Sequence, residues 1–277
     1  MREKKTTWQR IREYLPDKTV LDEHPPFDGD LSQPLFHKGN EIGCLTLHGI
    51  GGTPANIRVV ADELIARGYT VLSPTLPGHG ETVRALNHST YKQWLQCVYD
   101  AYARLKAEGC TEIYALGLSL GGVLSGLLAE NRRLDGLVMI CAPLEVQRFL
   151  RLSRHLSWLI PYVRYPSDDK PGSWRRNPYA QMYDGFSTIK LVDLKRLSRH
   201  LNKNLSRITC PVLTFSAAYD DKVDPVSIDI LMKGAVNAKE IRHIHLKNSP
   251  HGCTYGPERD LVAGACAALV AELAENN

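Results

Sequence analysis

The segment Gly117-Leu118-Ser119-Leu120-Gly121 constrains the fold of this chain more than any other. An apolar run, 113–116, precedes it and an aliphatic stretch follows it, so it predicts a strand, a sharp turn and a helix. The turn places its serine in strained backbone geometry, and a glycine on either side lets strand and helix pass closely. We therefore expect an exposed Ser119 at a helix N-terminus, where free N–H groups suit a developing oxyanion.

Strand-like and helix-like segments alternate along most of the chain, which predicts a parallel sheet covered by helices on both faces. The expected strands are Ile42–His48, Thr70–Pro74, Ile113–Leu116, Gly136–Cys141, Val212–Ser216 and Ile241–Leu246. The expected helices are Pro54–Arg67, Thr90–Ala107, Leu120–Asn131, Pro225–Val236 and Glu258–Glu275. The pattern indicates an α/β fold with a mostly parallel central sheet.

Two segments interrupt the alternation. Residues 1–32 form an N-terminal arm, in which Thr7–Leu15 has the pattern of a short amphipathic helix. Residues 144–207 separate two expected strands and are too long for a simple crossover. An insertion there lies over the carboxyl ends of the strands, where ligands bind in open α/β sheets. We therefore divide the chain into an arm (1–32), a core (33–143 and 208–277) and a small cap insertion (144–207).

The first part of the predicted cap has an amphipathic pattern. Its apolar residues recur at near-helical spacing: Val146, Phe149, Leu150, Leu156, Leu159, Ile160 and Val163. Three arginines, at 148, 151 and 154, fall on another face. Two interpretations stay open, a cap helix with solvated arginines or a weak contact with an anionic lipid surface. If the apolar face roofs the site, Phe149 and Leu156 are expected to bind substrate.

Composition excludes several functional classes. The chain has 277 residues, 43% hydrophobic and 23% charged, which is enough for one sizeable core. A net charge of +4, without a basic run interleaved with aromatic residues, argues against a nucleic-acid partner. The first ten residues lack the apolar core of a signal peptide, and no apolar run reaches the roughly 18 residues of a membrane helix. We therefore expect a soluble cytoplasmic protein.

The seven cysteines are odd in number and contain no C-x-x-C pair, which favours reduced, buried thiols over a disulfide framework. Cys253 lies near His251 and could be interpreted as a nucleophile. Ser119 is the better placed nucleophile, so this interpretation is disfavoured.

A serine hydroxyl needs a histidine to accept its proton and a carboxylate to orient that histidine. Asp220 and His251 each follow an expected strand. The acid precedes the histidine in the chain, which is the order expected when the nucleophilic serine lies in a sharp turn between a strand and a helix, the nucleophile elbow. Asp221 is the rival acid and Asp224 a more distant one. A surface turn is the alternative interpretation of 220–222.

The other histidines have simpler interpretations. His48 and His79 lie in glycine-containing turns and are expected to brace loops. His243 and His245 alternate along one strand, but no carboxylate or cysteine stands at ligand spacing, so no metal site is predicted there.

Acyl transfer also needs donors for the oxyanion. The residue after the nucleophile supplies one backbone N–H, here that of Leu120, and the loop after the strand ending at His48 supplies the second, expected from Ile50. This glycine-rich loop, 48–54, lacks the lysine of a phosphate-binding loop and the spacing of a dinucleotide fingerprint. No cofactor is therefore expected.

Several motifs occur in a characteristic order: Leu45-Thr-Leu-His-Gly-Ile-Gly-Gly52, Leu76-Pro-Gly-His-Gly80, Gly117-Leu-Ser-Leu-Gly-Gly122, Asp220 with Asp224-Pro225, and Asn248-Ser-Pro-His251. By these motifs, residues 40–270 resemble bacterial carboxylesterases and monoacylglycerol lipases of the α/β-hydrolase superfamily. The resemblance implies an α/β-hydrolase fold with Ser119 as nucleophile, Asp220 as acid, His251 as base, and Ile50 and Leu120 at the oxyanion hole. It also implies carboxylic ester substrates of short to medium acyl length, including monoacylglycerols. The arm and the cap depart from the family pattern.

The predicted function is a serine hydrolase that cleaves small carboxylic esters through an acyl-enzyme, without a metal or organic cofactor. A thioesterase or an acyltransferase with the same triad is the nearest alternative. A binding protein on the same scaffold, with little turnover, is another. A dehalogenase or an epoxide hydrolase is disfavoured, because those enzymes carry aspartate at the elbow.

Overall fold

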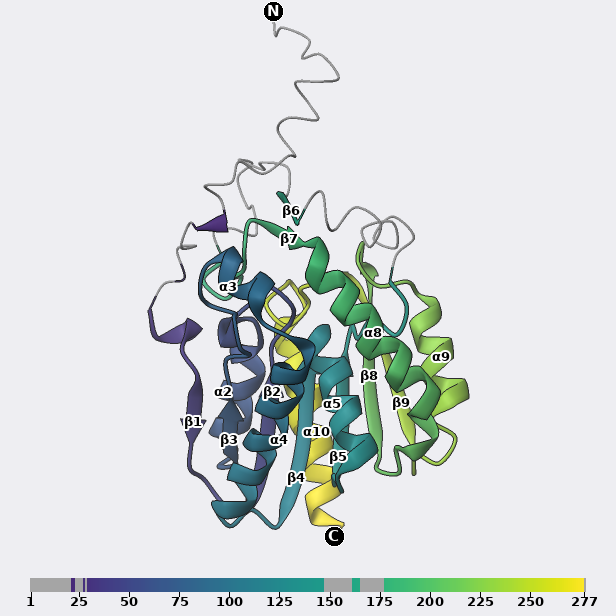
Figure 1. Ribbon diagram of the computed structural model, residues 1–277. Helices are drawn as coiled ribbons and strands as arrows, with labels where there is room; N and C mark the ends of the chain where they lie inside the picture. The colour runs from purple at the N-terminus through teal and green to yellow at the C-terminus, as the bar shows by residue number, and fades with distance from the viewer. Residues whose placement is uncertain (1–20, 23–26, 28, 147–160, 165–176, 277) are drawn as a thin grey trace, which may run out of the picture.

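Buried, mostly apolar runs form the central strands of the protein. The structure, a computed structural model, describes residues 21–22, 27, 29–146, 161–164 and 177–276. Its main sheet has seven strands in the order β1-β3-β2-β4-β5-β8-β9 (Figure 1). They are β1 (Leu35–His37), β2 (Ile42–Leu47), β3 (Thr70–Ser73), β4 (Glu112–Leu118), β5 (Gly136–Ile140), β8 (Val212–Tyr219) and β9 (Ile241–Pro250). Only β1 among them runs antiparallel to its neighbour, β3.

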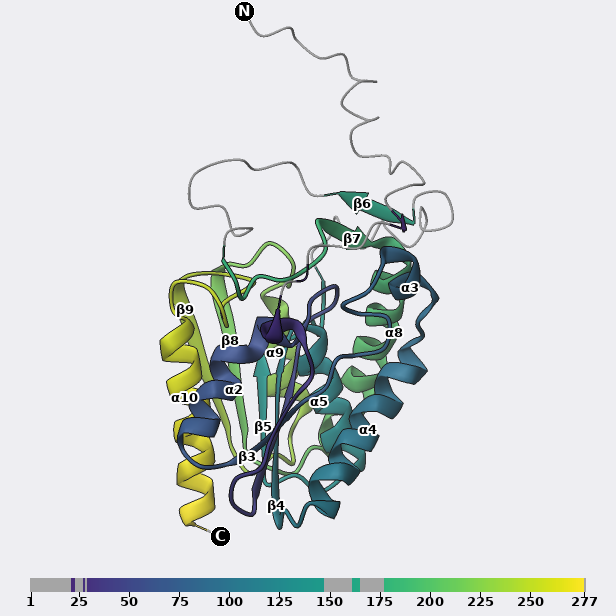
Figure 2. The same cartoon turned by 90° about the vertical axis from the view of Figure 1, so that its left-hand side faces the viewer.

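Helices cover both faces of this sheet. They are the short 3-10 helices η2 (Asp30–Ser32), η3 (Pro54–Ile57) and η5 (Leu205–Arg207), and the α-helices α2 (Arg58–Ala66), α3 (Val83–His88), α4 (Tyr91–Ala107), α5 (Leu120–Asn131), α8 (Thr188–Asn204), α9 (Val226–Gly234) and α10 (Arg259–Glu275). Figure 2 shows α2 and α10 on one side of the sheet and α4, α5 and α8 on the other.

Each face has its own hydrophobic core. Along β4, Ile113 and Ala115 pack on the side of α4 and α5, whereas Tyr114 and Leu116 pack on the side of α2 and α10. A strand that is buried on both faces needs apolar residues at every position, which explains its continuous apolar run. The serine turn follows this central strand.

The predicted α/β fold is confirmed in its main elements. All six expected strands are present, and the expected helix Leu120–Asn131 has the predicted bounds. Three strands were not expected: β1, and the pair β6 (Tyr162–Arg164) and β7 (Gly185–Ser187), which forms a separate antiparallel sheet. Each of them has three residues, too few for a recognisable alternation.

The segment predicted as a cap contains β6, β7, α8 and η5. The helical spacing proposed for its first part is wrong at Val163, which lies in β6 and pairs with Phe186. Phe149, Leu156 and the three arginines lie outside the described residues. Helix α8 packs beside α5, and its Leu197 and Leu201 join the core on that face (Figure 1). The division into arm, core and cap remains an interpretation.

Part of the predicted arm contacts the rest of the protein. The ring of Phe27 meets that of Tyr183 edge-on at 5.2 Å, and Asp22 accepts two hydrogen bonds from Arg84 of α3, at 2.5 and 2.9 Å. The expected helix Thr7–Leu15 lies outside the described residues. Within the described ranges, no helix combines the length and the apolar character that crossing a membrane requires.

Candidate active site

Ser119 occupies the sharp turn between β4 and α5. Its φ of 55° and ψ of −117° place it in a region that side chains rarely adopt. A Cβ at Gly117 would lie 2.1 Å from the carbonyl carbon of Gly121, and a Cβ at Gly121 would lie 2.1 Å from the carbonyl oxygen of Leu47. Only glycine fits at both positions, as the sequence predicted.

Three predicted site residues lie in a continuous hydrogen-bonded row at the carboxyl ends of the strands. The Nε2 of His251 lies 2.9 Å from the Oγ of Ser119, and its Nδ1 lies 2.8 Å from the Oδ2 of Asp220. His251 directly follows β9 and Asp220 directly follows β8. The rival acid Asp221 instead points to solvent, 66% exposed, and pairs with the Nζ of Lys222 at 2.7 Å.

Asp220 is placed to orient the histidine. Burial alone would raise the pKa of Asp220, but the attraction and the hydrogen bond of His251, with two backbone N–H donors, hold that pKa below its usual range. The two donors are the N–H groups of Lys222 and Val223, which lie 2.8 and 3.0 Å from Oδ1. Asp220 is therefore a carboxylate at neutral pH and accepts the Nδ1–H of His251. That tautomer leaves the Nε2 lone pair directed at Ser119.

The two predicted oxyanion donors flank Ser119. Leu120 is the first residue of α5, where a backbone N–H has no partner within the helix. Ile50 lies in the loop after β2, and a Cβ on the preceding Gly49 would lie only 3.4 Å from the Cβ of Ser119. The loop that carries Ile50 thus passes beside Ser119, and Leu120 follows Ser119 directly in the chain. The placement suits a shared oxyanion site.

His48 braces this loop, as its turn position suggested. Its Nδ1 lies 2.9 Å from the carbonyl oxygen of Gly49, and its Nε2 accepts the backbone N–H of Leu76 at 3.1 Å. Because Nε2 accepts, Nδ1 carries the proton. Burial lowers the pKa of His48 to about 4, so the neutral form persists. The ring of His79 packs against His48 at 5.0 Å.

An apolar pocket opens beside Ser119 and His251. It holds about 850 Å³, counting the space open to solvent at its mouth. Its apolar lining includes Leu86, Pro143, Val146, Met182, Phe186, Leu191, Leu194 and Val223. Sequence reasoning missed the residues of α3, β7 and α8. The spacing of Leu191, Leu194, Leu197 and Leu201 after Ser187, which caps α8, is the signal that could have found them.

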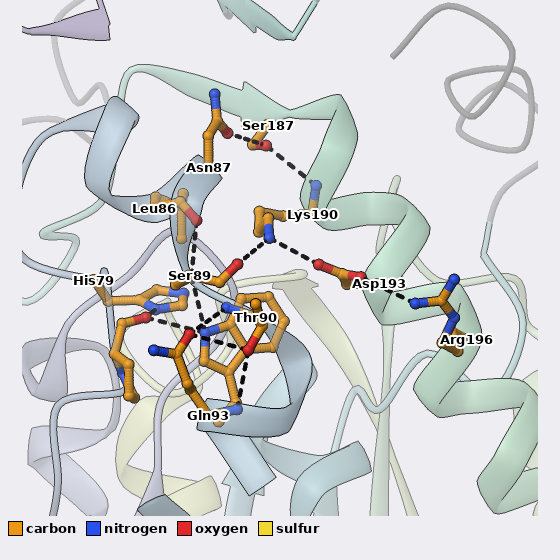
Figure 3. Close-up of polar contacts among 12 residues, drawn as sticks. His79, Leu86, Asn87, Ser89, Thr90, Gln93, Ser187, Lys190, Asp193 and Arg196 are labelled. Carbon is orange, nitrogen blue, oxygen red and sulfur yellow. Dashed lines mark hydrogen bonds and ion pairs between the residues drawn. The ribbon is translucent and has the colours of Figure 1, made fainter. Parts of the chain in front are cut away.

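A buried lysine joins two walls of this pocket (Figure 3). Lys190 of α8 is 2% exposed; its Nζ donates to the carbonyl oxygen of Ser89 and lies 2.7 Å from Oδ2 of Asp193. Three residues before Lys190, the hydroxyl of Ser187 donates to Oδ1 of Asn87 at 2.5 Å. These contacts hold the start of α8 against the end of α3, so both pocket walls have a fixed separation.

The remaining sequence candidates take structural positions. His243 and His245 each have a ring nitrogen 2.8 Å from the Oγ of Ser216, which lies between them. Cys253 is fully buried, and its Sγ lies 3.6 Å from that of Cys141 rather than in the position of a nucleophile. The hydrogen bond with Cys253, burial and the nearby Asp220 raise the pKa of Cys141 well above its usual range.

Comparisons with known proteins agree with this architecture. The sequence profile of the alpha/beta hydrolase family matches residues 44–269. The chain is 30% identical over 246 residues to the thermostable monoacylglycerol lipase of Bacillus sp. (strain H-257), covering 88% of this chain and 95% of that protein. It is 29% identical over 237 residues to the carboxylesterase of Bacillus subtilis (strain 168), covering 83% and 92%.

Solved structures give the same result. A structure of the metagenome-derived lipolytic enzymes LipS and LipT has a TM-score of 0.79 at 25% identity, covering 87% of this chain and 98% of that one. The monoacylglycerol lipase of Paleococcus ferrophilus, at 19% identity, has a TM-score of 0.70 over 88% of this chain and 98% of its own. The resemblance seen in the sequence motifs is thereby confirmed. The chain belongs to the alpha/beta hydrolase family and is an enzyme of the hydrolase class.

Proposed function

We propose that the protein is a serine hydrolase that cleaves carboxylic esters through an acyl-enzyme. The observation that carries the proposal is the row of hydrogen bonds from Ser119 through His251 to Asp220, at 2.9 and 2.8 Å, beside an apolar pocket. The relatives named monoacylglycerol lipase and carboxylesterase support an ester as the substrate.

The proposed reaction has two half-reactions. The Oγ of Ser119 attacks the ester carbonyl while Nε2 of His251 accepts its proton, and Asp220 holds the imidazolium in place. The N–H groups of Leu120 and Ile50 stabilise the tetrahedral oxyanion. His251 then gives the proton to the departing alcohol, which leaves an acyl-serine. A water molecule, deprotonated by His251, attacks the acyl-serine and releases the carboxylic acid.

The pocket supports an acyl group as the part of the substrate that it binds. Its apolar lining removes acyl methylenes from water, at about 0.8 kcal/mol for each buried CH₂. We therefore propose esters of short to medium acyl length, with monoacylglycerols among them. A weak contact of 144–207 with a lipid surface and a cytoplasmic location remain parts of the same proposal.

The first experiment replaces the proposed nucleophile. Ser119→Ala is expected to lower ester turnover on the order of 10⁴-fold or more, and His251→Ala nearly as much, with little further loss in the double variant. Ser125→Ala is the control. It removes a buried hydroxyl from α5, the helix that follows Ser119, and should retain activity. Turnover is measured with chromogenic acetyl, butyryl, octanoyl and lauroyl esters, and active-site occupancy with a fluorophosphonate.

Three results would contradict the proposal. Hydrolysis by the Ser119→Ala protein at nearly the wild-type rate would remove Ser119 as nucleophile. Faster turnover of an acyl thioester than of the oxygen ester with the same acyl group would make the protein a thioesterase. Transfer of the acyl group to an added alcohol in preference to water would make it an acyltransferase.

A further inference from the structure

Two thiols meet behind the proposed catalytic histidine. All seven cysteines are free, and most have no sulfur within hydrogen-bond distance among the described residues. Cys141, at the end of β5 with a φ of 46°, and Cys253, two residues after His251, are the exception. Their Sγ atoms lie 3.6 Å apart, and the two residues are 2% and 0% exposed. The proposed ester hydrolysis uses neither of them.

The pair of cysteines adjoins the proposed base, His251, and the carboxylate that orients it, Asp220. The Sγ of Cys141, a carboxylate oxygen of Asp220 and a ring nitrogen of His251 all lie within 4.8 Å of one another. Of the described residues, no other group of three potential metal ligands comes together in this way. These three atoms form one close group, and the Sγ of Cys253 adjoins the group through Cys141, at 3.6 Å.

This donor set matches the preferences of Zn²⁺ and related thiophilic cations. Zinc binds thiolate sulfur at about 2.3 Å and imidazole nitrogen at about 2.0 to 2.1 Å, with tetrahedral geometry. Two thiolates on one tetrahedral zinc stand roughly 3.8 Å apart. The sulfur separation of 3.6 Å already lies close to that value. The imidazole nitrogen and the carboxylate oxygen lie within 4.8 Å of the Cys141 Sγ, so the site requires the side chains to close around the cation.

We propose that Cys141, Cys253, Asp220 and His251 form an inhibitory site for a thiophilic divalent cation such as Zn²⁺ or Cd²⁺; the inhibition, though not the binding, rests on the proposed function. The cation binds two thiolates, and two thiol protons leave to solvent. It also takes the position of the proton on Nδ1 of His251, and that proton moves to Nε2. The metal-bound ring is then neutral with an N–H facing Ser119.

Inhibition follows from this change of tautomer. Nε2 of His251 is the atom that must accept the proton of Ser119, at 2.9 Å, and an N–H cannot accept it. Asp220, as a ligand, also no longer orients the ring. The cation thus blocks the base without entering the acyl pocket, so an ester should not compete with it.

The activity experiment titrates metal-free protein with Zn²⁺ while ester hydrolysis is followed. We expect full inhibition that EDTA reverses. Cys141→Ser and Cys253→Ser should each raise the half-inhibitory Zn²⁺ concentration at least tenfold, with every variant compared with its own metal-free rate. Cys97→Ser is the matched control, because Cys97 lies on α4 away from the cluster, and it should respond like wild type.

The binding experiment does not depend on activity. Cd²⁺ is titrated into the Ser119→Ala protein, and the thiolate-to-cadmium charge-transfer absorption is followed. One Cd²⁺ for each chain is expected, and the absorption should disappear when Cys141→Ser and Cys253→Ser are combined. If the protein binds Cd²⁺ in this way but the wild-type protein hydrolyses no ester, the metal site stands and the proposed function is wrong.

Three outcomes would overturn the site. The first is the absence of stoichiometric Cd²⁺ absorption in Ser119→Ala protein whose wild-type parent hydrolyses esters. The second is Zn²⁺ inhibition that both cysteine variants leave unchanged. The third is inhibition that a thiol reductant reverses and EDTA does not, because that result identifies a disulfide between the two cysteines.

Discussion

Asp220 and Asp221 are neighbours in the chain but lie in different surroundings. The side chain of Asp220 is 7% exposed and accepts the Nδ1–H of His251, whereas that of Asp221 is 66% exposed and pairs with Lys222. The turn that begins at Asp220 explains the difference, because the N–H groups of Lys222 and Val223 fix the first carboxylate and direct the second outward.

Replacement by asparagine should therefore have very different effects at the two positions. Asp220→Asn presents an amide that can stabilise the wrong histidine tautomer, so kcat for a butyryl ester should fall about 10⁴-fold. Asp221→Asn breaks an exposed ion pair and should change kcat less than about twofold. Steady-state kinetics on both proteins is the measurement. The reverse ranking would transfer the role of the acid to Asp221.

At the scale of elements, α8 forms one wall of the pocket, and its attachment depends on a buried ion pair. The side chains of Lys190 and Asp193 are 3% and 15% exposed, and the ammonium also lies 5.4 Å from the ring of Trp94. A charge removed from water in this way needs its partner, because the desolvation cost is otherwise uncompensated.

Removal of that partner should destabilise the protein. Asp193→Asn leaves the Lys190 ammonium buried without its anion, and the free energy of unfolding should fall by about 3 to 5 kcal/mol. Asp62→Asn is the control, since Asp62 pairs with Arg58 on α2 with a side chain that is 46% exposed, and the change there should stay below about 1 kcal/mol. Urea unfolding measures both. Equal losses of unfolding free energy in Asp193→Asn and Asp62→Asn would show that the ion pair of Lys190 and Asp193 is as solvated as an exposed one.

Local signals explain which elements were predictable. The buried strands have continuous apolar runs, and α5 begins at an elbow that glycine spacing marks. By contrast, β6 and β7 have three residues each and α3 has six, so they lack a period to detect. They form only because 162–164 and 185–187 pair with each other and α3 packs beside α8. Such contacts between distant residues cannot be inferred from local pattern.

The candidate site likewise has a part that the sequence predicted and a part that it did not. Ser119, His251 and Asp220 stand at the ends of predictable strands, so their chain order sufficed to choose them. The pocket wall depends on how α8 docks against α3, and that docking uses Lys190 and Ser187. A polar residue in a mostly polar helix gives no sign that it is buried. The structure thus adds pocket residues from a part of 144–207 that the sequence did not single out, and the contacts predicted for Phe149 and Leu156, outside the described residues, stay a prediction.

For the whole molecule, the buried histidines link stability to pH. Burial lowers the pKa of His48 to about 4 and that of His79 well below its usual value, whereas an unfolded histidine titrates near 6.5. Between these values the unfolded chain binds more protons than the folded one. The stabilisation is thus complete above about pH 6.5 and is lost as the pH falls toward 4.

The free energy of unfolding should therefore decrease by about 3 kcal/mol from His48 alone between pH 6.5 and pH 4, and His79 adds to the loss. Asp220 acts in a lower window, because its pKa lies below 3.8. Urea unfolding at several pH values measures the slope of the unfolding free energy against pH. His48→Gln should reduce that slope by an amount that corresponds to at most one bound proton. An identical slope in that variant would contradict the burial of a neutral His48.

The glycines of the serine turn also bear on how such a protein can change its substrates. Gly117 and Gly121 have no space for a single methyl group, so the turn can hardly vary without separation of β2, β4 and α5. The pocket wall is different, because Phe186, Leu191 and Leu194 end in pocket space and can become smaller or larger without moving a strand. A lineage, or a laboratory selection, that acquires a new substrate preference would accumulate its substitutions on that wall and keep the serine turn unaltered.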